Sequence, residues 1–189
     1  INKMFIETIS TPNPNTLKFI PGCDVLPNDT RDYRNIENAK ESPLAERLLE
    51  IDGISGVFLS GDFIAVTKTD KEWNQLKPII LGEIMDHFLS NNPIIIEHGI
   101  KSKNTKEEFF DKVDAVIVKT IKELIETRVR PAVAQDGGDI TFQGYENGTV
   151  YLNMQGACAG CPSSTMTLKN GIENLLKHYI PEIKEVEAL

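Results

Sequence analysis

The spacing of apolar residues changes several times along the chain, and each change marks an expected strand or helix. In the first half, short alternating or β-branched runs predict strands, and apolar residues at three- and four-residue steps predict helices. Ser42 followed by Pro43 indicates a helix start, because Ser favours the N-cap and Pro the first helical position. The expected elements are strands at 4–9 and 16–20, a helix from Ser42 that ends before Gly53, strands at 57–59 and 63–67, and a helix from Thr69 or Asp70 to Phe88.

The first half is therefore expected to fold in the order ββαββα. Residues 21–41 are polar and carry Pro21, Gly22 and Pro27, so they predict a loop with little regular structure. Pro78 falls inside the last predicted helix and indicates a kink there.

The second half opens with a long amphipathic pattern. Apolar residues recur at helical spacing from Glu107 to about Ala134, which predicts one helix that Pro131 ends or bends. Strands are expected on either side of Asn147-Gly148, the strongest short-range hairpin signal. The remaining elements of this αββαβ order are strands at 139–142 and 149–154, a helix from Ser163 to Tyr179 with Met166 on its apolar stripe, and a strand at 183–186.

These two patterns predict an α+β protein made of two small domains. The segment 97–106 is polar and separates two stretches that each look complete. We expect a first domain at 1–97, a linker at 98–106 and a second domain at 107–189.

Composition excludes several classes of function. The chain has 189 residues, 40% of them apolar and 25% charged, which suits two small domains with their own cores. The 28 acidic residues outnumber the 20 basic ones, and this net charge of −8 argues against a nucleic-acid partner. No apolar run approaches the roughly 20 residues that a membrane-spanning helix needs. Three cysteines are too few for a disulfide framework, so we expect a reducing compartment. The first residues show neither a positive stretch followed by an apolar segment nor an Arg- and Ser-rich amphipathic helix, so we expect no targeting peptide there.

The strongest candidate for chemistry is the pair Cys158 and Cys161. They lie three residues apart in a loop of Gly and Ala immediately before a predicted helix. Small neighbours let a large inorganic ligand approach the backbone, and a helix start offers amides and partial positive charge to thiolates. This pattern favours a metal or an anionic cluster as the ligand.

Two thiolates do not complete such a site. Zinc sites and iron–sulfur clusters normally take about four protein ligands. Cys23 belongs to the other predicted domain, and His87, His98 and His178 show no ligand spacing. The count reaches four if two copies of the second domain meet at this loop around one shared centre. A shared centre of this kind suits a carrier that releases its cluster when the pair separates.

Other readings of the Cys pair remain open at this point. A thioredoxin-like dithiol has the same spacing, but it expects a Pro between the cysteines, whereas Pro162 follows the second one. A zinc site shared across a dimer uses the same ligands. Two structural cysteines in a packed turn would need more apolar neighbours than this loop supplies. A fourth reading is an adaptor that recruits partners mainly through residues 1–97.

Several nearby residues are interpreted as structural. Gly137-Gly138 lacks a phosphate-binding pattern and predicts a turn that places the hairpin beside the cysteine loop. Asp136 and Asp139 flank that turn, where acids usually act as caps or Asx-turn residues. His178 lies near a helix end and fits the helix dipole.

Longer motifs in both halves resemble a known family. The second half is similar to the NifU C-terminal-type domain of Nfu iron–sulfur proteins, and the first half to the Nfu N-terminal domain. The motifs that carry this resemblance are Arg130-Pro131, Asp136–Asp139, Gly156–Ser164 and Thr167–Glu173 in the second half, and Thr11–Phe19, Ser42–Ala45, Asp62–Lys68 and Trp73–Pro78 in the first.

The resemblance implies a cluster assembly scaffold or carrier rather than an enzyme. The implied cargo is a [4Fe–4S] cluster shared between two subunits, with Cys158 and Cys161 as its ligands. The implied partners are a second copy of the chain, upstream cluster-assembly proteins and apo iron–sulfur proteins that accept the cluster, with the first domain as a contact module. The expected location is the cytoplasm of a bacterium, which we prefer here, or the mitochondrial matrix of a eukaryote.

Overall fold

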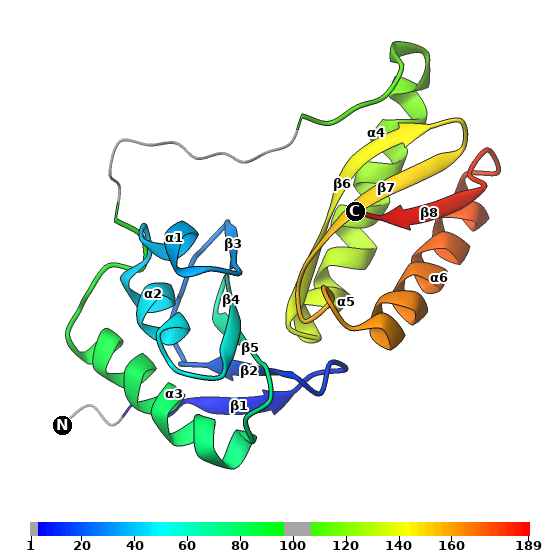
Figure 1. Ribbon diagram of the computed structural model, residues 1–189. Helices are drawn as coiled ribbons and strands as arrows, with labels where there is room; N and C mark the ends of the chain where they lie inside the picture. The colour runs from blue at the N-terminus through cyan, green and yellow to red at the C-terminus, as the bar shows by residue number, and fades with distance from the viewer. Residues whose placement is uncertain (1–3, 97–106) are drawn as a thin grey trace. The chain divides into compact units, whose positions relative to one another are not determined.

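The computed structural model describes residues 4–96 and 107–189, and the chain divides into two compact units, Ile1–Lys101 and Ser102–Leu189 (Figure 1). The expected linker at 98–106 lies outside the described residues. Each unit has its own sheet, helices and apolar core, so the protein is of the mixed α+β class, as predicted.

The first unit is an antiparallel five-stranded sheet with helices on one face. The sheet has the order β1-β2-β5-β4-β3. Residues such as Phe19, Leu59 and Ile64 are fully buried and belong to the same apolar core as residues of the helices. The elements are β1 (Glu7–Ser10), β2 (Thr16–Ile20), β3 (Thr30–Tyr33), α1 (Ile36–Ala39), α2 (Pro43–Leu49), β4 (Ile54–Ser60), β5 (Phe63–Lys68) and α3 (Trp73–Leu89).

The predicted order ββαββα was wrong in one place, because β3 and α1 lie in the segment expected to be a loop. β3 is polar and only Tyr33 is buried in it, so it has no hydrophobic pattern of its own. It is an edge strand held by pairing with β4, where Tyr33 faces Val57. α1 is a single turn capped by Asn35, whose side chain accepts a hydrogen bond from the Asn38 amide at 2.9 Å. Pairing with a distant strand cannot be seen in local periodicity.

The helix starts were predicted with mixed success. Ser42 is the N-cap of α2 and accepts from the Ala45 amide at 3.3 Å, which confirms the expected start. α3 begins at Trp73 rather than at Thr69 or Asp70, and it continues through Pro78. The Trp73 indole donates to the Pro14 carbonyl at 3.0 Å and so fixes this helix start to the β1–β2 turn.

The second unit is a three-stranded sheet with its helices on one face (Figure 1). β6 and β7 form the expected hairpin, and Asn147 and Gly148 both have positive φ at its turn. β8 returns beside β7 in parallel. The elements are η1 (Lys112–Asp114), α4 (Ala115–Leu124), η2 (Ile125–Val129), α5 (Arg130–Gln135), β6 (Gly138–Glu146), β7 (Thr149–Gly156), α6 (Pro162–Tyr179) and β8 (Glu185–Ala188).

The long helix expected from Glu107 begins later than predicted. Phe109 instead extends the sheet, because its amide donates to the Gln143 carbonyl at 3.1 Å and its carbonyl accepts from the Tyr145 amide at 2.9 Å. Its ring fills the space that a side chain at Gly144 would need. Val113 is one of the apolar residues at helical spacing between Glu107 and Ala134, and Met166 was placed on the apolar stripe of the last predicted helix, but both are largely exposed.

The helix is also not uniform. Residues Ile125–Val129 form a π-helical turn, and Pro131 follows it at the start of α5. A Pro ring clashes with the carbonyl four residues earlier, and a wider turn relieves that clash. Pro131 therefore changes the winding of the helix without ending it. Among the described residues, no helix is both long and apolar enough to cross a lipid bilayer.

Candidate metal centre at the Cys158–Cys161 loop

The loop between β7 and α6 brings Cys158 and Cys161 to one end of the second unit. β7 ends at Gly156, and the Ala159 amide donates to the Gly156 carbonyl at 3.1 Å to close a tight turn. Gly156 and Gly160 have φ of 64° and 79°, a conformation that residues with a side chain rarely adopt. These two glycines of the motif are therefore required by the path of the backbone.

Cys161 is the N-cap residue of α6, with Pro162 at the first helical position. The Thr165 amide donates to the Cys161 carbonyl at 2.9 Å, and its hydroxyl donates to the Cys158 carbonyl at 3.0 Å. Thr165 thus holds both cysteine backbones against the first turn of the helix. The Ser163 hydroxyl lies 3.5 Å from the Cys161 sulfur. The helix start directs partial positive charge to this point, which favours an anionic ligand.

The two thiols have different surroundings. Cys158 is only 5% exposed and packs into the apolar core of the unit, whereas Cys161 is partly exposed. Burial, and to a smaller extent the nearby carboxylates of Asp136 and Asp139, together raise the pKa of Cys158 to about 12. The expectation that the helix start favours a thiolate is thus wrong for Cys158 in the absence of a ligand. A bound metal ion would supply the positive charge that the protein does not.

Gly137 and Gly138 form the turn that supports Cys158. Gly137 has a φ of 80°, and its carbonyl accepts from the Ala157 amide at 3.1 Å. A Cβ added at Gly138 would overlap the Cys158 sulfur and lie 2.8 Å from the Gln155 carbonyl oxygen. The prediction that this turn lies beside the cysteine loop is confirmed. The sequence did not show that Gly138 must also leave room for the sulfur.

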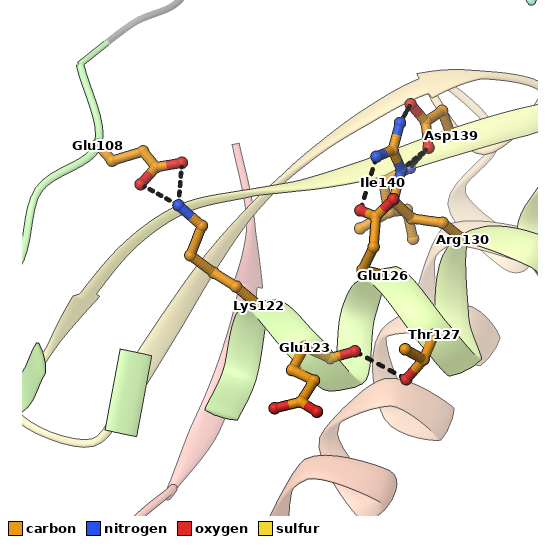
Figure 2. A network of polar contacts seen from close by, with 8 residues as sticks. All are labelled: Glu108, Lys122, Glu123, Glu126, Thr127, Arg130, Asp139 and Ile140. Carbon is orange, nitrogen blue, oxygen red and sulfur yellow. Dashed lines mark hydrogen bonds and ion pairs between the residues drawn. The ribbon is translucent and has the colours of Figure 1, made fainter. Parts of the chain in front are cut away.

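Asp139 was interpreted as a cap or Asx-turn residue, and this was wrong. Its buried carboxylate receives two hydrogen bonds from Arg130, both at 2.9 Å (Figure 2). Arg130 also donates to the exposed Glu126 at 2.8 Å. Asp136 does occupy the C-cap of α5, as expected. From the sequence, Arg130 was named only as part of a family motif. Its contact with Asp139 joins a helix to a strand, and local residue spacing does not predict such a contact.

The remaining candidate ligands do not join this site within the second unit. His178 lies in the last turn of α6, as predicted, and its ring packs edge-on against Tyr179. His87 is fully buried in α3 and Cys23 is exposed, both in the first unit, and His98 lies outside the described residues. Over residues 4–96 and 107–189, no group of three or more His, Cys, Asp or Glu side chains could hold a metal ion. Within the described residues of the second unit, the loop therefore offers a pair of thiols and no third ligand.

Comparisons with known proteins agree with both halves of this architecture. Residues 6–91 match the family model for the scaffold protein Nfu/NifU N-terminal domain, and residues 121–187 match the model for the NifU-like domain. The human NFU1 iron-sulfur cluster scaffold homolog is 49% identical over all of this chain and 73% of its own length. NifU-like protein 4 of Arabidopsis thaliana is 48% identical over 97% of this chain and 65% of its own. The chain belongs to the Nfu/NifU family of scaffold proteins.

Both of these relatives are named as mitochondrial. The chain spans less than two thirds of several relatives, such as 65% of the Drosophila erecta homolog, to which it is 47% identical over 98% of this chain. The solution structure of a NifU-like protein from Saccharomyces cerevisiae is 26% identical, covers 50% of this chain and 87% of its own, and has a TM-score of 0.45.

The close packing at Gly138 predicts the effect of a single methyl group. Gly138→Ala should lower the free energy of unfolding by about 1–3 kcal/mol, because the Cβ overlaps Cys158 and a backbone carbonyl. Gly171→Ala is the matched control, since Gly171 is exposed within α6 and a Cβ there meets nothing within 4 Å. It should raise stability by about 0.5–1 kcal/mol. Urea unfolding of both variants measures this, and equal effects would contradict the packing.

Burial of Cys158 predicts slow alkylation. At pH 8 the thiolate fraction at a pKa of about 12 is roughly a thousandfold below that at the ordinary 9.0, so iodoacetamide should label Cys158 in the folded chain about a thousandfold more slowly than in the urea-unfolded chain. Peptide mass spectrometry over a time course measures the rate at each cysteine, with the exposed Cys23 as the internal comparison. Labelling of Cys158 at the rate of the unfolded chain would contradict the raised pKa.

Proposed function

We propose that the protein is an iron–sulfur cluster scaffold and carrier. Two copies hold one [4Fe–4S] cluster on four thiolates, Cys158 and Cys161 from each, and pass it to apo-proteins. The observation that carries this proposal is the incomplete site: a paired Cys motif at a helix start, with no third ligand among the described residues of its own unit. Membership in the Nfu/NifU scaffold family supports it.

A twofold axis at the loop would complete the ligand count. Such an axis presents the same surface twice, so two thiols per chain become four around one centre. The cluster core with four thiolates carries a net charge of −2, and the first turn of α6 from each chain offers partial positive charge to it. The two helix starts thus offset part of the negative charge of the cluster.

Loading and release follow from the unequal thiols. Each ligand must lose its proton to bind iron, so loading releases the Cys158 proton that burial otherwise holds. Release runs in the opposite direction, as acceptor thiolates replace the protein ligands one at a time. We place the first exchange at Cys161, because it is the more exposed thiol of the pair.

The remaining parts of the proposal concern partners and location. The first unit serves as a contact module for acceptors and for the upstream assembly proteins that supply the cluster. No bond in an organic substrate is made or broken, so the protein acts as a carrier rather than an enzyme. The relatives named as mitochondrial support the mitochondrial matrix over the bacterial cytoplasm that the sequence alone led us to prefer.

A dithiol–disulfide oxidoreductase is the alternative that the same motif allows. That reaction needs each cysteine to act in turn as an attacking thiolate or as a leaving group. Burial and two neighbouring carboxylates raise the pKa of Cys158, which slows both steps. The surroundings of Cys158 thus disfavour a redox thiol, whereas a bound metal ion would offset the cost of deprotonation with its own positive charge.

Anaerobic reconstitution with iron and sulfide tests the proposal. The wild-type chain should bind about four iron and four sulfide per two chains, as expected for one shared cluster. Cys158→Ala and Cys161→Ala should each lose this content, and Cys23→Ala is the matched control that should keep it. Circular dichroism checks that each variant is folded. Full cluster content in either variant of the pair, or turnover of a disulfide substrate by the iron-free monomer, would contradict the proposal.

A further inference from the structure

We propose that Arg130 is a positioning residue for the cluster site, and that it acts through Asp139 to hold the turn on which Cys158 packs. The inference rests on the proposed function and adds to it a residue that controls how long the cluster is held. Arg130 touches neither cysteine in the described contacts, so its effect has to pass through the backbone of residues 137–139.

The Arg130–Asp139 contact has the geometry of a strong ion pair. The Nε and Nη2 atoms of Arg130 donate to Oδ1 and Oδ2 of Asp139, each at 2.9 Å. The side chain of Asp139 is 6% exposed, and its Oδ1 also accepts from the Ile140 amide at 2.9 Å. Two parallel charged hydrogen bonds fix both the distance and the orientation of the carboxylate. Asp139, which follows the glycine turn in β6, is therefore held to Arg130 at the start of α5.

The same stretch of backbone is in direct contact with the cysteine loop. Gly138 precedes Asp139 and leaves no space between its Cα and the Cys158 sulfur. In the hairpin, Gly138 pairs with Gly156 and Asp139 pairs with Gln155, just before the loop begins. The Ala157 amide also bonds the Gly137 carbonyl at 3.1 Å. A displacement of Asp139 must therefore move the surface against which Cys158 rests.

The winding of the helix explains why Arg130 reaches Asp139. Its amide donates to the Ile125 carbonyl, five residues back, which is the π-helical pattern. Thr127 also donates its hydroxyl to the Glu123 carbonyl at 2.7 Å, a contact that bends helices (Figure 2). Each residue in a helix turns the next side chain by about 100°, so one extra residue in the turn redirects all that follow. The wide turn before Pro131 is thus what aims Arg130 at β6.

Glu126 supplies the matched control. It accepts from Nη1 of Arg130 at 2.8 Å, and its side chain is 65% exposed (Figure 2). Its loss leaves both bonds to Asp139 in place. Arg130→Lys, in contrast, keeps the positive charge and removes the paired geometry, because one ammonium group cannot make two parallel bonds.

The experiment loads the 189-residue chain with iron and sulfide, adds an excess of chelator and follows the loss of the cluster absorbance. We expect Arg130→Lys to load normally but to lose the cluster about tenfold faster than wild type, with Glu126→Gln within twofold of wild type. Val186→Ala controls for general destabilisation, since Val186 is a core residue of β8 that pairs opposite Val150, at the far end of β7 from the loop. It should also keep the wild-type lifetime.

A second measurement uses the cluster-free protein and determines how fast Cys158 reacts with iodoacetamide. Iodoacetamide should label Cys158 at least tenfold faster in Arg130→Lys than in wild type, and at the wild-type rate in Glu126→Gln and Val186→Ala. If Arg130→Lys fails to fold, Asp139→Asn weakens the same contact with little change of shape, and the same results are expected of it.

Three results would overturn the inference. One is an Arg130→Lys protein that matches Glu126→Gln in both measurements, and another is a Val186→Ala protein that loses the cluster equally fast. The third is unchanged Cys158 labelling in Arg130→Lys and Asp139→Asn. Failure of the proposed function gives a different result, because wild type would then hold no cluster on Cys158 and Cys161, while the labelling rates would still report on Arg130.

Discussion

The site depends on one close contact, the packing of the Cys158 sulfur against the backbone of Gly138. There is no room for a Cβ at this point, so two separate segments of the chain must both keep their conformation for the loop to form. Gly137 turns the chain with a positive φ, and Asp139 holds its far side through Arg130. The cysteine loop is thus supported by a partly buried ion pair, a glycine turn and a hairpin register that depend on one another.

This support makes the two cysteines unequal, and the inequality suits a carrier. Cys158 belongs to the apolar core, whereas Cys161 begins a helix at the surface. A ligand fixed in the core gives the site a defined geometry, and a ligand at the surface gives a partner access to the metal. A site with four buried ligands in one chain would hold its cluster more firmly and release it less easily.

The sequence predicted those features that depend on neighbours along the chain. The Asn147-Gly148 hairpin, the Ser42 cap and the C-x-x-C motif at a helix start are all local patterns, and all three were found in the structure. The features that were missed are made between distant segments. β3 is a strand because it pairs with β4, and Phe109 joins the sheet through its hydrogen bonds to β6. The contact between Arg130 and Asp139 joins a helix to a strand. The burial of Cys158 was missed for the same reason, because its small neighbours suggested an exposed loop and only the folded hairpin covers it.

The central claim is that one cluster is shared by two chains. Native mass spectrometry tests it most directly on a sample in which equal amounts of unlabelled and nitrogen-15-labelled chains are reconstituted together with iron and sulfide. The account predicts dimers of light–light, light–heavy and heavy–heavy composition, each with the added mass of a single four-iron cluster, and bare monomers when the cluster is removed. A cluster carried by a single chain, or dimers that form equally well without iron, would contradict it.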